Sequence, residues 1–284
     1  MKDQTHSNHP SPTGDPSGSP AGHSPADAPP ANSPPTDRPK VELDLASCPA
    51  LTPPPGWVDR CGELGIVFEG DDLERLGRFL AMLLHANTRM NLTAIRDEAQ
   101  AWDKHIYDAL TLVPLLAELE DESMVIDIGS GGGLPGVPLA IVMGDLRFTL
   151  MDATRKKCDY LQEVVDALDL KNARVINARA EQLGHDRGEK TADGRIRAHR
   201  ERYDIALARG VGPIAMLAEL TVPLLKVGGL VLMTKGQRAE EELAEAKQAL
   251  YLLHTNHAGT VETETGKVVV LEKMRKTPRD YPRR

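Results

Sequence analysis

The residues with the clearest chemical potential form a glycine-rich stretch, DIGSGGGLPG, at residues 127–136. An apolar run of strand type at 125–128 leads into it, and a helical pattern begins at Leu134, so the stretch lies where a strand turns into a helix. Glycine lets the backbone turn tightly and approach a ligand closely, and the start of a helix favours electron-rich groups. These residues therefore predict a binding site for a ligand that carries electron-rich groups.

Two patterns compete for this stretch. Gly131, Gly133 and Gly136 fit G-x-G-x-x-G, the fingerprint of dinucleotide-binding proteins. The register is poor for that fingerprint, because the predicted strand already ends at Gly129. The pattern D-x-G-x-G-x-G, which begins at Asp127, fits better and is typical of Rossmann-like S-adenosylmethionine (SAM) methyltransferases. A glycine-rich turn without a ligand stays a third interpretation.

Further polar residues follow the next predicted strands. Asp152 ends the second strand, 23 residues beyond Gly129, where an acid can accept hydrogen bonds from ribose hydroxyls or can cap the next helix. Ala180-Glu181 follows the third strand, where an adenine edge or a cofactor amide would be recognised, although Glu181 could simply be exposed. Arg209 ends the fourth strand and is a candidate for binding an anion or carboxylate, with an ion pair at the rim as the alternative.

A sheet must bring these residues together, and the rest of the pattern predicts one. Apolar runs predict strands at 125–128, 148–151, 174–176, 203–207 and 230–233, and helical patterns lie at 134–142, 154–168, 213–225 and 239–250. Alternation of this kind predicts a parallel sheet covered by helices on both faces. Stretches near 260–264 and 268–271, joined by a Thr-Gly turn, predict an antiparallel pair at the sheet edge. We expect an α/β, Rossmann-like class I fold with a mostly parallel seven-stranded sheet, an antiparallel C-terminal strand and N-terminal helices.

The domain organisation follows from composition. Residues 1–55 hold 14 of the 21 prolines, and residues 1–40 contain almost no large apolar side chain, so we expect a disordered Pro-rich tail at 1–55. Residues 56–284 are expected to form one domain, with a helical segment at 56–120 and the Rossmann-like core at 121–284. In the helical segment, leucine spacing predicts a helix that begins near Asp71, and a second helix is predicted over about 97–116.

Composition also excludes several classes of protein. The formal net charge of −8 argues against a general coat for nucleic acid, so any RNA contact must use a local basic patch. No apolar run reaches the ~18 residues that a membrane span needs, and the N-terminus lacks the apolar segment of a secretory signal. Three cysteines without C-x-x-C spacing argue against a disulfide framework and a zinc site. We expect a cytoplasmic protein that binds no metal.

Several ordered blocks are together far more specific than the glycine bend. They are NLTAIRD (91–97), His105 with DAL (108–110), DIGSGGGLPGVPLA (127–140), LMDATRKKCDYL (150–161), ARAEQL (178–183), LARG (207–210), TKG (234–236) and TPRDYPRR (277–284). From about Leu73 to the C-terminus, the chain resembles the ribosomal RNA small subunit methyltransferase G family, also called GidB-like. The tail at 1–55 and a stretch at 184–202, which looks like an insertion, depart from the family pattern.

The resemblance implies SAM-dependent methylation at N7 of a particular guanosine in the 16S rRNA of the small ribosomal subunit. The predicted cofactor-binding residues combine those that the resemblance implies with Gly131 of the bend and with Asp152, which matches the family's second-strand acid: Gly129, Gly131, Leu134, Asp152, Ala180, Glu181 and Arg209. Two alternatives stay open, a SAM-dependent methyltransferase of a small molecule and a non-catalytic SAM- or RNA-binding module.

The absence of other motifs agrees with attack by a ring nitrogen. SAM carries an activated methyl group, and guanine N7 has a free lone pair, so attack requires orientation but no general base. Enzymes that methylate exocyclic amines usually carry Asn/Asp-Pro-Pro-aromatic after the fourth strand, where this chain reads Ala-Arg-Gly-Val-Gly at 208–212. Methylation at pyrimidine C5 needs a cysteine nucleophile. Cys61 lies outside the predicted sheet and Cys158 within a predicted helix, so neither is expected to react.

RNA binding is expected from patches of basic residues. The run at 273–284 carries six basic residues and one acid. The stretch at 184–202 has six basic and four acidic residues, and it either contacts RNA or forms a solvated loop. We expect 16S rRNA or the small ribosomal subunit as partner and a monomeric enzyme. The candidates for the pocket of the target base are Asn91, His105, Arg209 and Lys235.

Overall fold

The computed structural model describes residues 47–190, 196–210 and 212–283. The tail predicted to be disordered lies outside these residues up to residue 46, and so does the middle of the 184–202 stretch, residues 191–195. The described part begins before residue 56, the predicted start of the domain. Leu51 packs against the core there, with its carbonyl oxygen directly over Gly77.

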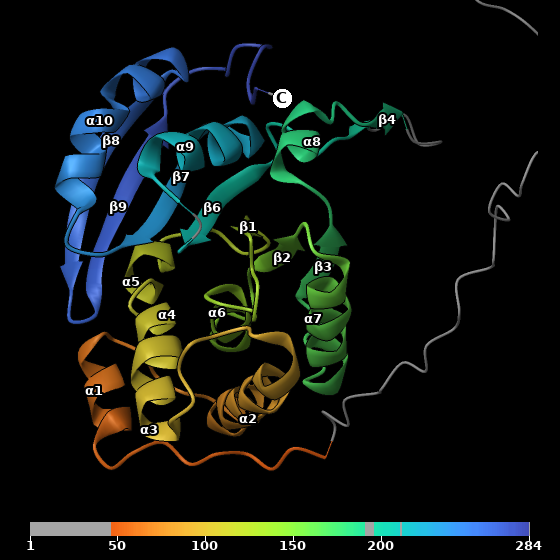
Figure 1. Cartoon of the computed structure of the whole chain (residues 1–284), viewed down its shortest axis with the longest axis vertical. Helices are drawn as coiled ribbons and strands as arrows, with labels where there is room; N and C mark the ends of the chain where they lie inside the picture. The colour runs from red at the N-terminus through yellow and green to blue at the C-terminus, as the bar shows by residue number, and fades with distance from the viewer. Residues whose placement is uncertain (1–46, 191–195, 211, 284) are drawn as a thin grey trace, which may run out of the picture. The chain divides into compact units, whose positions relative to one another are not determined.

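A seven-stranded sheet forms the centre of the described part (Figure 1). Its strands, in spatial order, are β3 (Ala173–Asn177), β2 (Arg147–Asp152), β1 (Met124–Ile128), β6 (Tyr203–Arg209), β7 (Leu225–Lys235), β9 (Gly266–Lys273) and β8 (Thr255–Thr263). All neighbours pair in parallel except β9, which runs antiparallel to both β7 and β8. The prediction of a mostly parallel, seven-stranded Rossmann-like sheet with an antiparallel strand near the C-terminus is confirmed.

The strand order places a crevice next to β1. The chain builds outward from β1 to β2 and β3, then crosses back to add β6 and β7 on the other side of β1. Helices on such sheets cover opposite faces on the two sides of this reversal, which leaves a crevice at the carboxyl ends of β1 and β6. The glycine bend follows β1 directly, and Arg209 ends β6, so both predicted groups meet at this crevice.

Helices cover both faces of the sheet (Figure 1). Their bounds are α1 (Trp57–Glu63), α2 (Asp72–Met90), α3 (Glu98–Ala101), η1 (Trp102–Tyr107), α4 (Asp108–Leu110), α5 (Val113–Leu116), α6 (Gly136–Val142), α7 (Arg155–Ala167), α8 (Ala180–His185), α9 (Ile214–Thr221), η2 (Val222–Leu224) and α10 (Ala239–Leu252). A short hairpin, β4 (Glu189–Lys190) with β5 (Ile196–Arg197), stands apart from the sheet. None of the described helices is long and apolar enough to cross a membrane.

Each buried strand supplies side chains to two cores, because successive residues of a strand point to opposite faces. Val125 and Leu207 pack in one core with helices α1, α2, α6 and α7. Ile126 and Ala206, their sequence neighbours, pack in the other core with α8, α9 and α10. The near-continuous apolar runs of the central strands follow from this double burial.

The predicted helix at 97–116 is not continuous. It divides into α3, the π-helical turn η1, the short α4 and then α5, which begins after a turn and carries Pro114 in its first turn. Within the wider η1 turn, the carbonyl oxygen of Lys104 accepts a hydrogen bond from the guanidinium of Arg209, which comes from strand β6. π-Helical turns inside helices frequently mark functional sites. A helix period read from sequence does not reveal a donor that arrives from a distant strand.

Candidate active site

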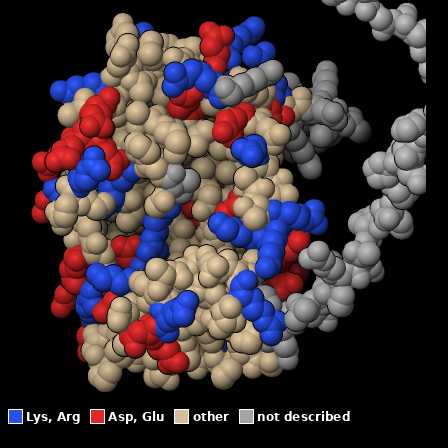
Figure 2. Space-filling model, in the orientation of Figure 1, with Lys and Arg blue, Asp and Glu red and all other residues tan. Residues whose placement is uncertain are grey.

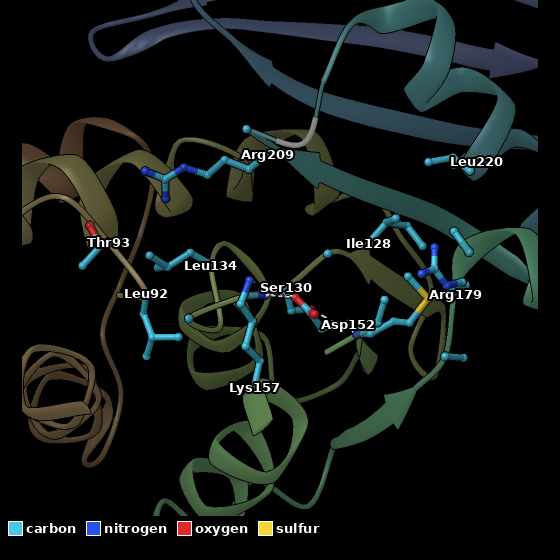
Figure 3. A pocket seen from close by; sticks show the side chains of 18 of the residues that line it. Leu92, Thr93, Ile128, Ser130, Leu134, Asp152, Lys157, Arg179, Arg209 and Leu220 are labelled. Carbon is cyan, nitrogen blue, oxygen red and sulfur yellow. Dashed lines mark hydrogen bonds and ion pairs between the residues drawn. The ribbon is translucent and has the colours of Figure 1, made fainter. Parts of the chain in front are cut away.

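A cavity of about 530 Å³ opens at the carboxyl ends of β1, β2 and β6 and is closed on one side by the loop after α2 (Figure 3). Its lining contains every residue predicted to bind the cofactor: Gly129, Gly131, Leu134, Asp152, Ala180, Glu181 and Arg209. His105, a candidate for the target-base pocket, lines the same cavity. These residues come from segments as far apart as η1 and β6, so the fold assembles one site from several sequence blocks.

The glycine bend is held by hydrogen bonds to the neighbouring strand. The backbone N–H groups of Gly129 and Ser130 both donate to the carbonyl oxygen of Met151 in β2, at 2.8 and 2.9 Å. The Ser130 hydroxyl donates to the carbonyl of Asp127 at 3.1 Å and accepts from the N–H of Met151 at 3.1 Å. Gly129 and Gly131 adopt left-handed φ values of 72° and 56°, which glycine tolerates without strain. The bend is therefore a rigid part of the sheet edge.

Asp127 anchors the helix that follows the bend. Its side chain is 1% exposed, and Oδ2 accepts the N–H of Gly136, the first residue of α6, at 3.1 Å. A Cβ at position 136 would lie 2.8 Å from that same oxygen and would also meet Leu150, so only glycine allows the contact. Burial raises the pKa of Asp127 to about 7. Asp127, the acid of the D-x-G motif, therefore lies beneath the cavity lining, where it holds the first residue of α6.

Asp152 holds the bend and faces the cavity (Figure 3). One carboxylate oxygen accepts the N–H of Gly131 at 3.1 Å, and the other accepts the N–H of Thr154, which precedes α7, at 2.8 Å. The Lys157 ammonium lies 3.7 Å away. The carboxylate therefore holds the turn that leads into α7 and also offers acceptor capacity to a ligand. Its predicted contact with a ribose stays a prediction.

Arg209 joins the end of β6 to the divided helix. Its Nε lies 3.2 Å from the Asp108 carboxylate, and its Nη2 donates to the carbonyl oxygen of Lys104 at 2.5 Å. The third nitrogen, Nη1, is buried and has no hydrogen-bond partner among the described residues. An unpartnered guanidinium donor costs free energy unless a ligand satisfies it. Arg209 therefore does form an ion pair, with Asp108, but it also binds the backbone of η1 and keeps one donor without a partner among the described residues.

A hydrogen-bond chain fixes His105 in the cavity wall. Nδ1 lies 3.1 Å from the carbonyl oxygen of Lys104 and 3.5 Å from Nη2 of Arg209, and Nε2 lies 2.7 Å from the Thr93 hydroxyl. The N–H of Ile95 donates to that hydroxyl at 3.1 Å, and the N–H of Thr93 donates to Oδ1 of Asn87 at 2.9 Å. Burial, with Arg209 nearby, lowers the pKa of His105 to about 4, so the imidazole is neutral at pH 7.

Two candidates for the target-base pocket lie outside the cavity lining. Asn91 ends α2 in a left-handed conformation, φ 51°, and is exposed. Lys235 is largely buried, and its ammonium pairs with Glu242 at 2.7 Å and donates to the carbonyl oxygen of Gly212. Their sequence blocks suggested proximity to the site, but the pairing of Lys235 with Glu242 has no signature in sequence.

Several other lining residues were not predicted from sequence as cofactor or target-base residues, among them four whose side chains lie at the cavity. They are Thr93, Lys157, Arg179 and Leu220 (Figure 3). Lys157 follows Asp152 by five residues and Arg179 directly precedes Ala180, so closeness to the predicted strand ends was the available signal. Thr93 lies within the NLTAIRD block, which carries part of the family resemblance.

The cavity fits SAM by its chemistry. A Cβ at Gly131 would meet only the carbonyl oxygen of Gly129, at 3.6 Å, so the bend leaves open room beside the cavity. The buried Nη1 of Arg209 is a donor without a partner among the described residues, as the carboxylate of a methionine moiety would require. Asp152 supplies an acceptor for hydroxyl groups, and Ile128, Met151 and Leu220 supply apolar walls.

Comparison with known proteins points to one family. Residues 72–270 match the model of the family described as "rRNA small subunit methyltransferase G". A protein of that name from Sorangium cellulosum is 45% identical over 245 residues, which cover 86% of this chain and 98% of the relative. One from Leuconostoc citreum is 37% identical over 233 residues, 80% of this chain and 93% of the relative.

A solved structure, of a SAM-dependent methyltransferase from Aquifex aeolicus, is 16% identical with a TM-score of 0.45, covering 61% of this chain and 92% of the other. A likeness this distant adds nothing to the strand order described above. The match to the family model spans most of the chain, and the two relatives exceed 30% identity over nearly their whole length. The chain therefore belongs to the rRNA small subunit methyltransferase G family.

Proposed function

We propose that this protein transfers a methyl group from SAM to N7 of a guanosine in the 16S rRNA of the small ribosomal subunit. The observation that carries the proposal is the convergence of all seven predicted cofactor residues on one cavity at the reversal of strand order. Ligands of open α/β sheets bind at this place. Family membership supports the reaction, and the geometry supports the location.

The cofactor's parts match different walls of the cavity. SAM supplies a methyl group that is already activated by its sulfonium. The glycine bend and Arg209 suit the methionine end, because the bend leaves room beside the cavity and Arg209 has a guanidinium donor without a partner among the described residues. Asp152 suits the ribose hydroxyls, and Ala180 with Glu181 suits the adenine. Each assignment is made on chemistry at the cavity wall.

Thr93 and His105 suit the target base. N7 attack requires no general base, so the enzyme's part is to orient the purine and exclude water. Methylation at N7 moves positive charge from the sulfonium to the purine ring. A His105 with a pKa of about 4 is uncharged at pH 7 and does not oppose that charge. Cys61 and Cys158 offer no competing nucleophile, because burial raises the pKa of Cys61 to about 12 and also raises that of Cys158.

Local basic surface supports an RNA partner despite the net charge of −8. Figure 2 shows basic side chains on both sides of the hollow at the centre of this face. Lys157 and Arg179 line the cavity itself, and Lys156 is exposed beside Lys157. Positive charge at the mouth of a site attracts phosphate groups and positions the strand without reading its sequence. We infer that the rRNA enters over this rim, that the enzyme acts as a monomer and that it works in the cytoplasm.

The test uses SAM with a labelled methyl group and either 30S subunits or free 16S rRNA. The expected result is label in the rRNA that, after digestion to nucleosides, co-migrates with 7-methylguanosine. Gly129→Asp should abolish the label, because it strains a φ of 72° and places a carboxylate in the cofactor subsite. Gly144→Asp is the matched control, since a Cβ there meets nothing within 4 Å.

Each other outcome decides against part of the proposal. Label in rRNA at a different nucleoside would refute the N7 assignment and keep the methyltransferase. Transfer only to a small molecule would favour the alternative substrate class. SAM uptake without any transfer, to either form of the rRNA, would leave a binding module. Thermal unfolding of Gly129→Asp checks that it folds, and Asp152→Ala is the second loss-of-binding variant.

A further inference from the structure

The end of the chain and the 184–202 stretch, two basic segments of the sequence, are joined by one guanidinium. Arg200 donates to the carbonyl oxygens of Tyr281 at 2.7 Å, Thr277 at 2.9 Å and Pro278 at 3.1 Å. The same guanidinium donates to the carbonyl oxygen of Gly184, in α8. Four carbonyl groups around one cation leave it little capacity for a phosphate. Arg200 therefore binds protein backbone at a position where the sequence suggested an RNA contact or a solvated loop.

The last residues lie against both α8 and α9 (Figure 1). Pro282 is buried against Gly184, where an added Cβ would lie 2.6 Å from its ring. The carbonyl oxygen of Pro282 lies 2.7 Å from Nε2 of His185. Arg283 forms a two-pronged ion pair with Glu219 of α9, at 2.9 Å from Nε to Oε1 and 2.6 Å from Nη2 to Oε2. The segment thus contacts the far end of α8 and the middle of α9.

Both helices carry walls of the cavity. Ala180 and Glu181 are the first two residues of α8, and Leu220 lies in α9. α8 has six residues, and a helix that short is not stable on its own in water. Its position must come from tertiary contacts, and the contacts of Gly184 and His185 with the chain end and Arg200 are of that kind. A loosened chain end would let the cavity wall at Glu181 move.

We propose that the segment 277–283 and Arg200 form a C-terminal latch that positions α8 for the cofactor. Arg200, Pro282 and Arg283 are positioning residues in it, acting through α8 and α9. The proposal deepens the proposed function and rests on it, because it takes SAM as the occupant of the cavity. It separates two roles within the basic C-terminus: Arg283 is committed to Glu219, whereas Lys276 and Arg279 are exposed and form no ion pair with the described residues.

The decisive comparison is Arg200→Lys against Arg279→Ala, in the full chain. Lysine keeps the charge but cannot donate to four carbonyl groups in a fixed plane, whereas Arg279→Ala removes a charge from the same segment without removing any of the latch contacts described above. Arg200→Lys should weaken SAM binding in calorimetry about tenfold, the effect of losing roughly one charged hydrogen bond. It should raise KM for SAM and leave kcat at saturating SAM unchanged. Arg279→Ala should leave SAM affinity at the wild-type value.

A second readout needs no cofactor. Hydrogen exchange of the amide groups at 180–185 should be faster in Arg200→Lys than in wild type, and unchanged in Arg279→Ala. Gly184→Ala should have the same effect as Arg200→Lys, because its Cβ displaces Pro282 without altering any charge. This pair keeps the proposal testable if one variant folds poorly, which thermal unfolding reports.

The outcomes separate the latch from the proposed function. Wild type that takes up no SAM would refute the function, while the exchange comparison would still decide on the latch. If Arg200→Lys and Gly184→Ala both showed the amide exchange rates and the SAM affinity of the wild type, the latch proposal would be overturned. A loss of RNA binding in Arg200→Lys with normal SAM affinity would assign this arginine to RNA instead.

Discussion

The buried Asp127 carboxyl should make stability depend on pH in a way that one substitution removes. The side chain is 1% exposed, one oxygen has no partner among the described residues, and burial raises its pKa from 3.8 to about 7. The folded state then holds a proton that the unfolded chain has lost between about pH 4 and pH 7. Stability from this group is fully present below pH 3.8 and falls as pH rises towards 7.

The size of the effect follows from the shift. One pKa unit corresponds to about 1.4 kcal/mol, so the full difference is about 4 kcal/mol, and roughly 3 kcal/mol of it lies between pH 5 and pH 8. Asp127→Asn cannot ionise, and its carbonyl oxygen can still accept the N–H of Gly136. Its buried amide N–H₂ adds a cost that does not change with pH. The stability of the variant relative to wild type should therefore rise by roughly 3 kcal/mol from pH 5 to pH 8.

Urea unfolding of both proteins at several pH values measures this difference directly. Titration of other groups, including His105 and Lys273, cancels when the two proteins are compared at each pH, provided that those groups are unaffected by the substitution. A difference that stays constant from pH 5 to pH 8 would refute the reasoning, because it would mean that Asp127 ionises in the folded protein as easily as in the unfolded chain. A difference of opposite slope would mean that the ionised carboxylate is the stabilised form.

Three further predictions concern the cavity. Gly136→Ala should cost about 1–3 kcal/mol of stability, because its Cβ would lie 2.8 Å from the Asp127 carboxylate; an unchanged melting temperature would contradict this. Asp152→Ala removes the acceptor of two backbone N–H groups and the predicted ribose contact, so SAM should bind at least about tenfold more weakly in calorimetry, and an unchanged Kd would rule out the ribose role. Thr93→Val removes the hydroxyl that hydrogen-bonds His105 Nε2 and should raise KM for rRNA while leaving the Kd of SAM unchanged; a weaker SAM affinity instead would place Thr93 in the cofactor subsite.

The sheet and the cofactor wall were predictable because their signals are local. Strand 125–128, the glycine bend and Asp152 were recognised from apolar runs, glycine spacing and an acid at a strand end. Parallel strands place their carboxyl ends at one edge of the sheet, so residues at those ends converge without further information. Asp152 and Arg209, which end predicted strands, lie in the cavity lining for this reason, whereas Leu134 was expected there only from the family resemblance.

The target-base candidates show where that logic fails. His105 lines the cavity, but Asn91 and Lys235 do not, since neither reaches the crevice. Lys235 ends a strand at the correct edge, and Glu242 from the next helix binds it at 2.7 Å. The predicted helix at 97–116 also differs from the structure, since it contains a π-helical turn, where Arg209 binds the carbonyl oxygen of Lys104, 105 residues earlier.

By itself, the sequence determined the parallel sheet, the position of the glycine bend and the residues that line the cofactor wall. Each of these depends on spacing over a few residues and on the common direction of the strands. Only the tertiary structure decided that Arg209 holds η1, that Thr93 orients His105 and that Arg200 binds the chain end, 81 residues away at Tyr281. The physical reason is that a hydrogen bond needs its donor and acceptor within about 3 Å, and the path of the whole chain sets that distance.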